Sequence, residues 1–277
     1  MPSSDHDTPP EPAGRSARGP WRQVLLPSEH GAWAFLAEPI ALGLLVAWSA
    51  TGLLLALAAI AAFLTRRPLR IALTDWRERK RHPRTPRAEG ALALLALAGA
   101  AAFAVALARD PGAALFTLRL AVLPGVVALA FDLGGRSREA AGELSAALAL
   151  SVVTPGIALA GGWSHAAAFG LWLLLVARIV TSIVYVRARL RLEKGEPAGV
   201  TGALAVHGVA LLVALVLAAR GSTPWLGAAA VALLGLRAAL GLSALRPRMT
   251  TTQLGFSEIA FGVVTILAVA AGFAWCL

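Results

Sequence analysis

Apolar residues gather into nine long stretches along this chain, and short polar or charged segments separate them. The stretches cover residues 31–48, 51–65, 90–108, 113–132, 144–162, 166–186, 200–219, 224–245 and 257–276. Runs of about 17 or more apolar residues are long enough for an α-helix to cross a bilayer. The pattern predicts an all-α membrane protein with about nine transmembrane helices. The second stretch is short, and every later orientation would invert without it.

Composition supports a membrane protein. Hydrophobic residues make up 58% of the 277 residues and charged residues only 14%, whereas soluble domains carry about 25% charged residues. The single cysteine, Cys276, allows no disulfide framework and no cysteine metal site. Residues 1–24 are rich in proline and poor in apolar side chains, so we expect a disordered cytoplasmic tail. Residues 25–277 form the predicted transmembrane domain.

The basic residues predict how the chain is oriented. With the N-terminus inside, the cytoplasmic segments 1–30, 66–89, 133–143, 187–199 and 246–256 hold 20 of the 25 Lys and Arg residues. The external segments hold only Arg109 and Arg220. Because short loops rich in Lys and Arg stay in the cytoplasm, this bias predicts nine spans with the C-terminus outside. The net charge of +10 is therefore read as membrane anchoring, and not as nucleic-acid binding.

Seven acidic, basic or histidine residues fall within the predicted spans or at their edges, and such groups are costly in a bilayer. They are Glu38, Arg119, Asp132, Arg178, His207, Arg237 and Glu258. Arg119 lies near the outer leaflet, where its side chain can reach the interface. Arg178 lies deeper, so we expect it to face the bundle and to pair with Glu38 or Glu258. A structural ion pair and an active site are both open readings. Three prolines, Pro39, Pro124 and Pro155, should kink or break their helices.

The string Pro27-Ser28-Glu29-His30-Gly31-Ala32-Trp33 precedes the first span. Ser28 could cap the helix, Glu29 suits its positive end, and Trp33 could anchor it at the interface. This structural reading leaves His30 unexplained. A glycine after His30 permits close approach of a ligand or a neighbouring helix, so Glu29 and His30 are also candidate ligand-binding residues.

The segment 66–89 carries nine basic residues around Asp75. Three readings stay open for it. Asp75 could be a local ion-pair partner, and the cations could attract anionic lipid head groups. Alternatively, basic residues including Arg66, Arg70 and Arg77 could form a pocket for a phosphate or diphosphate, because guanidinium groups match phosphate oxygens.

The other cytoplasmic ends of the spans carry further candidates: Asp132 closes the fourth span and Arg136 follows it, Tyr185 and Arg187 lie at the end of the sixth, and Glu258 opens the ninth. All face one side of the membrane, so we predict a basic cavity that opens to the cytoplasm. The complete set of candidate ligand-binding residues is Glu29, His30, Asp75, Arg77, Asp132, Arg136, Arg178, Tyr185, Arg187 and Glu258. The sequence identifies no catalytic residue, no metal site and no cofactor.

Several strings together resemble the YwiC-like family of bacterial membrane proteins. They are Pro27–Trp33, Arg67–Asp75, Asp132–Glu139 with Glu143-Leu144, Tyr185–Arg189 and Gln253–Ile259. The resemblance covers roughly residues 25 to 277. It implies a multi-pass protein of the bacterial cytoplasmic (inner) membrane and no established reaction.

The predicted architecture also resembles that of UbiA-type intramembrane prenyltransferases, with nine helices and functional loops after the second and sixth. Those enzymes hold Mg²⁺ and a prenyl diphosphate with two aspartate-rich motifs. Here only Asp75 follows the second span and no aspartate follows the sixth. A UbiA-like helical bundle is therefore expected, while metal-dependent transfer is doubtful because Mg²⁺ prefers carboxylate ligands.

The sequence favours a membrane protein with a basic cavity for an anionic, isoprenoid or lipid-linked ligand, and enzyme activity stays open. The expected partners are the bilayer, anionic lipid head groups and an isoprenoid or other anionic amphiphile. One alternative is a transporter, although no inverted repeat is evident. Another is a haem- or quinone-linked subunit, in which His30 and His207 would be axial ligands.

Overall fold

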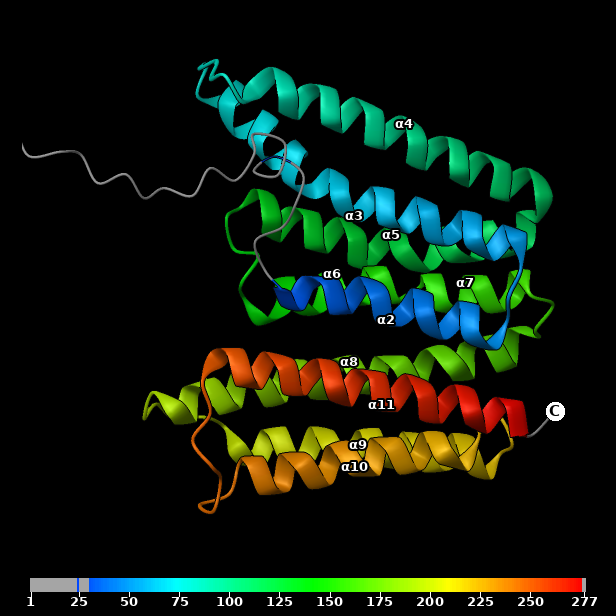
Figure 1. Ribbon diagram of the computed structural model, residues 1–277, viewed down its shortest axis with the longest axis vertical. Helices are drawn as coiled ribbons and strands as arrows, with labels where there is room; N and C mark the ends of the chain where they lie inside the picture. Colours follow the sequence, from blue (N-terminus) through cyan, green and yellow to red (C-terminus); the bar gives the residue numbers. More distant parts are fainter. Residues whose placement is uncertain (1–23, 25–29, 276–277) are drawn as a thin grey trace, which may run out of the picture.

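The computed structural model describes residue 24 and residues 30–275, and these form an all-helical bundle (Figure 1). The helices are α2 (His30–Val46), α3 (Ala50–Arg77), α4 (Thr85–Arg109), α5 (Pro111–Leu133), α6 (Ala140–Ser151), α7 (Val153–Ala160), α8 (His165–Glu193), α9 (Val200–Ala219), α10 (Trp225–Gly241) and α11 (Thr251–Trp275). Each predicted stretch coincides with one helix, or with the pair α6 and α7. The prediction of an all-α protein is confirmed for the described residues.

Seven of the described helical segments are long and apolar enough to cross a membrane, with α6 and α7 together forming one of them. The apolar parts of α2 and α10, Trp33–Val46 and Trp225–Gly241, are shorter. The short second stretch of the sequence lies in α3, which is among the seven. The chain is therefore a multi-pass membrane protein, while the count of nine crossings and the side of the N-terminus stay predictions.

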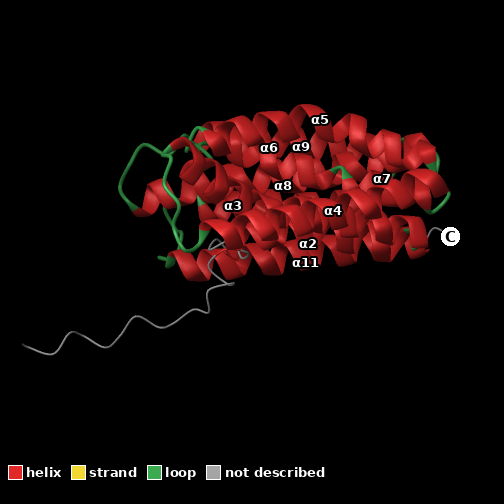
Figure 2. Ribbon diagram, turned by 90° about the horizontal axis from the view of Figure 1, so that it is seen from above, coloured by secondary structure: helices red, strands yellow, loops and turns green. Residues whose placement is uncertain are grey.

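The helices run roughly parallel to one another, so that their connections gather at the two ends of the bundle (Figures 1 and 2). One end carries the arginine-rich connections α3–α4, α5–α6, α8–α9 and α10–α11. The opposite end carries the connections α2–α3, α4–α5, α7–α8 and α9–α10 together with the end of α11. The four predicted cytoplasmic segments that follow α3, α5, α8 and α10 therefore lie at one end of the bundle, which we call the basic end.

The outer surface is suited to hydrocarbon. Large apolar side chains such as Leu97 and Leu123 are exposed along the helices. Exposed tryptophans Trp48, Trp225 and Trp275 lie at the end opposite the basic end, where indole rings favour a membrane interface. The main core surrounds α8, which packs against α6, α7, α9, α10 and α11.

One predicted boundary was wrong. The basic segment 66–89 was expected to be a loop, but α3 continues to Arg77 and only residues 78–84 separate it from α4. The apolar stretch ends at residue 65, but Arg, Leu and Ala still favour helix. Of the three prolines that were expected to kink or break helices, Pro155 lies beside the break between α6 and α7, while α2 and α5 are not broken at Pro39 and Pro124.

Candidate functional site

Asp75 joins the two arms of the α3–α4 hairpin. Its carboxylate is 1% exposed, accepts a 2.6 Å hydrogen bond from the Thr85 hydroxyl and lies 3.1 Å from the Arg84 guanidinium. The Thr85 hydroxyl also accepts a bond from the His82 backbone N–H. These contacts fix the 78–84 connection to the start of α4. Asp75 therefore has the surroundings expected of a local ion-pair partner. The neighbouring Arg77 is exposed.

Asp132, at the end of α5, lies against two arginines of α3. Its carboxylate oxygens are 3.6 Å from Arg66 Nε and 3.9 Å from Arg70 Nη1. Both separations exceed a hydrogen bond, so these guanidinium groups keep donors available for another acceptor. Asp132 is buried while Arg66 and Arg70 are partly or largely exposed. The arrangement leaves one net positive charge at the basic end of α3 and α5.

Arg136 and Arg187 form two further pairs at the basic end. Arg136 binds Glu139 through two parallel bonds, Nε to Oε1 at 2.5 Å and Nη2 to Oε2 at 2.8 Å. Because Arg136 stabilises the ionised carboxylate, the pKa of Glu139 lies below its ordinary value. Arg187 Nη1 lies 3.1 Å from Glu143 and also donates to the Arg138 carbonyl, which links α8 to α6 and its preceding connection.

A buried ionic cluster occupies the bundle between α2, α8, α10 and α11. Arg178, only 3% exposed, donates to Glu38 Oε1 at 3.2 Å and to the Glu258 backbone carbonyl at 2.8 Å. Its Nη1 is 3.6 Å from the Glu258 carboxylate. The same carboxylate accepts hydrogen bonds from Arg237 and Ser182. The prediction that Arg178 faces the bundle and pairs with Glu38 or Glu258 is confirmed, because it pairs with both.

Gly262 makes room for this cluster. A Cβ atom at that position would lie 2.0 Å from Glu38 Oε1 and 3.0 Å from Arg178 Nη2. Because any side chain at this point of α11 would collide with the ion pair, the cluster depends on a glycine one turn after Glu258.

Tyr185 belongs to the same region. The Arg237 guanidinium lies over its ring at 4.1 Å from the centroid, and the Phe261 ring lies 4.9 Å from the same group. Such cation–π contacts stabilise a guanidinium group away from water. Tyr185 therefore lies beside the ionic cluster, next to Arg237 and not at the basic surface.

The remaining two candidates are Glu29 and His30. Glu29 lies outside the described residues. His30 is the first residue of α2, but its side chain lies outside the described part. His207 is buried on α9, and its Nδ1 lies 2.8 Å from the Ala203 carbonyl. Among the described residues, no three His, Cys, Asp or Glu side chains gather as they would around a metal ion.

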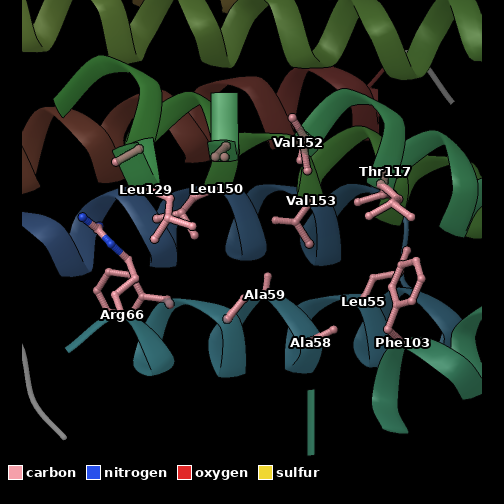
Figure 3. A pocket seen from close by; sticks show the side chains of 17 residues that line it. Leu55, Ala58, Ala59, Arg66, Phe103, Thr117, Leu129, Leu150, Val152 and Val153 are labelled. Atoms are coloured by element: carbon pink, nitrogen blue, oxygen red, sulfur yellow. The ribbon is translucent and has the colours of Figure 1, made fainter. Parts of the chain in front are cut away.

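An apolar groove lies between α3 and α5, with α6 and α7 behind it (Figure 3). Its volume is about 310 Å³. Small side chains dominate its walls, including Ala58, Ala59, Ala121 and Gly125. Arg66 lies at one end, whereas Leu55, Phe103 and Thr117 lie at the other. Arg66 and Thr117 are the polar side chains of the lining.

The candidates do not share one cavity, contrary to the sequence prediction. Asp75, Asp132, Arg187 and the Arg178–Glu258 pair take part in separate contacts between different pairs of helices. None of the eight candidates whose side chains the structure describes lines the groove between α3 and α5. Residues on one side of a membrane can lie far apart in the membrane plane. The order of the spans along the sequence does not show where each helix lies in that plane.

Sequence reasoning proposed Arg66 for a phosphate pocket but missed two residues, Ser182 and Arg189, that make buried polar contacts. Arg189 is completely buried, donates to the Gly241 and Pro247 carbonyls and lies 2.8 Å from Glu193. It attaches the α10–α11 connection to α8. The signal that could have indicated Arg189 is its spacing, since an arginine two residues after Arg187 must lie on another helix face.

Comparison with known protein families gives a match in the first part of the chain. Residues 26–158 match the family model described as YwiC-like protein. The predicted resemblance to the YwiC-like family is confirmed over this part, which runs from α2 to α7. The family-like strings at 185–189 and 253–259 lie outside the matched range. No curated protein and no solved structure matches the chain, so the UbiA-like bundle stays a prediction.

Proposed function

We propose that this YwiC-like protein binds an anionic amphiphile, with its isoprenoid or acyl chain in the groove between α3 and α5 and its head group beside Arg66. One observation carries the proposal: an apolar groove of about 310 Å³ ends at a guanidinium group. Binding sites for amphiphiles need an apolar cavity with a few polar groups that fix the head. This groove, within the part that matches the family, has both.

The length of the groove suits a single hydrocarbon chain. Its lining on α3 extends from Leu55 to Arg66, which is about 16 Å at 1.5 Å per helical residue. That length is about half of the ~30 Å hydrocarbon core of a bilayer. A chain with its head at Arg66 would therefore lie along the membrane normal and reach past the middle of the bilayer.

The walls suit a methyl-branched or a straight chain more than a bulky ring. Ala58, Ala59 and Ala62 of α3 face Ala121 and Gly125 of α5 across the groove. Small side chains leave a narrow slot in which a chain makes many contacts with both helices. Burial of each CH₂ group contributes about 0.8 kcal/mol relative to water, although competing lipid chains reduce the difference inside a membrane.

The charges at Arg66 suit a phosphate or diphosphate head group. Arg66 and Arg70 keep donors free because Asp132 lies 3.6 Å and 3.9 Å from them. Two arginines and one aspartate leave one net positive charge, which a phosphate would neutralise. Guanidinium groups bind phosphate oxygens through paired hydrogen bonds.

The proposal is tested by identifying what remains bound after purification. Wild-type protein in mild detergent would be examined by native mass spectrometry with farnesyl diphosphate, an anionic phospholipid or phosphatidylcholine added in equal amounts. We expect an anionic amphiphile to bind in preference to phosphatidylcholine, and Arg66→Gln to remove that preference. Arg119→Gln is the matched control, because Arg119 is an exposed arginine of α5 that does not line the groove. Equal retention of all three probes, or no effect of Arg66→Gln, would contradict the proposal.

A further inference from the structure

Arg237 is held rigidly at a buried position on α10. Its side chain is 8% exposed, and its guanidinium lies against the rings of Tyr185 and Phe261. One nitrogen, Nη1, donates to the Glu258 carboxylate. The orientation of the guanidinium plane is therefore fixed from three sides by α8 and α11.

The other edge of this guanidinium has no partner. Nε and Nη2 of Arg237 are buried and make no hydrogen bond to any described residue. These two nitrogens form the edge with which an arginine binds both oxygens of a carboxylate or phosphate. Arg136 uses the same two nitrogens for the two oxygens of Glu139 in this protein. The edge of Arg237 presents the same two donors.

Unpaired donors of this kind are costly, especially in a membrane. A buried polar group without a hydrogen bond loses its hydration and gains nothing in return, and the hydrocarbon core offers no water as a substitute. We propose that the Nε/Nη2 edge of Arg237 is a binding site for a small oxyanion, a carboxylate or a phosphate. This site is separate from the groove and does not depend on the proposed amphiphile.

Arg237 lies near the basic end of the bundle. It precedes Gly241, the last residue of α10, by one turn, which is about 6 Å along the helix. The connection 242–250 follows, and Arg189 holds it through the carbonyls of Gly241 and Pro247.

The charge of the cluster predicts that a proton binds with the anion. Glu38, Glu258, Arg178 and Arg237 sum to zero, so an added anion leaves one negative charge in the bundle. His207 is a neutral acceptor on α9: its Nδ1 lies 2.8 Å from the Ala203 carbonyl, and its buried Nε2 has no partner among the described residues. Ala203 packs in one core cluster with Tyr185 and Ala238, which brings this part of α9 against α8 and α10. Arg237 and Glu258 are the charged groups that act on His207.

Isothermal titration calorimetry on the full chain in detergent tests this site. The probes are sodium acetate and sodium phosphate, with sodium chloride as the reference at constant ionic strength, at about pH 6 and about pH 8. We expect one acetate or phosphate per chain, bound more tightly at the lower pH. Saturation by acetate alone identifies a carboxylate site, and saturation by phosphate alone identifies a phosphate site.

The deciding variant is Arg237→Lys, which keeps a positive charge opposite Glu258 but removes the paired donors. Its affinity should fall by about tenfold or more, the equivalent of one lost charged hydrogen bond. Arg119→Lys, at an exposed arginine outside both proposed sites, should bind as wild type does. Equal affinity in Arg237→Lys would overturn the site. A wild-type titration in which neither probe exceeds chloride would also overturn it, without need of any variant. Equal affinity at both pH values would overturn the role of His207.

Discussion

Arg178 on α8 donates to Glu38 on α2 at 3.2 Å, although the two residues are 140 positions apart in the sequence. Glu38 lies within the part that matches the YwiC-like family, and Arg178 lies beyond it. The pair therefore joins the two halves of the bundle through a contact that neither half could make alone. Because both side chains are buried, each partner depends on the other to remain charged in an apolar interior.

Removal of one member of this pair should destabilise the protein strongly. Arg178→Met leaves Glu38 buried without its principal partner, which typically costs about 3–5 kcal/mol when a buried pair is broken. A large fall in melting temperature in detergent is expected, and the double variant Glu38→Gln with Arg178→Met should recover part of the loss. Arg119→Met, at an exposed arginine, should change the melting temperature little. A single variant as stable as wild type would show that the pair contributes nothing.

Gly262→Ala should also destabilise the protein, because the added methyl group would collide with the Glu38–Arg178 ion pair. The added methyl group would lie 2.0 Å from Glu38 Oε1, so the ion pair must move or separate. Gly208→Ala on α9 is the matched control, because nothing lies within 4 Å of its Cβ position and alanine favours helix by about 1 kcal/mol over glycine. The melting temperature should fall in the first variant and stay equal or rise in the second. The opposite order would be inconsistent with the packing of α2 against α11.

Asp75→Ala should loosen the α3–α4 hairpin. The change removes the acceptor of Thr85 and Arg84, and buried hydrogen bonds to charged groups contribute about 1.5–3 kcal/mol. The 78–84 connection contains Arg79, Lys80 and Arg81, so limited trypsin digestion reports its opening directly. Cleavage in this connection should be faster in Asp75→Ala than in Glu78→Ala, whose carboxylate is half exposed. Equal rates would indicate that Asp75 does not hold the connection.

A reporter fusion tests the predicted orientation. An enzyme that is active only outside the cytoplasm should be active when fused after Leu277 and inactive when inserted in the 78–84 connection. This result follows from nine crossings and from the cytoplasmic preference of arginine-rich segments. Activity at both positions, or only in the 78–84 connection, would reverse the assignment of the basic end.

The helices could be predicted from the sequence because apolar length alone indicates a membrane span. Their ends could not, since α3 and α8 continue past the apolar residues into arginine-rich turns. The pairing of Arg178 could also be predicted, because a deep charge in a bilayer requires a partner and only a few acidic residues lie at a suitable depth. The groove could not be predicted. It depends on which small residues of α3 and α5 face one another in the membrane plane, and the order of the spans does not contain that information.

The account depends most on the groove as a binding site, and Gly125→Leu tests it most directly. Gly125 lines the groove, and nothing lies within 4 Å of its Cβ position, so a leucine side chain can fill the space without displacing a neighbour. Gly208→Leu introduces the same change on α9, where space is also open but no groove wall is involved. Native mass spectrometry should show the anionic amphiphile bound to wild type and Gly208→Leu and lost from Gly125→Leu. Retention of the amphiphile by Gly125→Leu at the wild-type level would contradict the account.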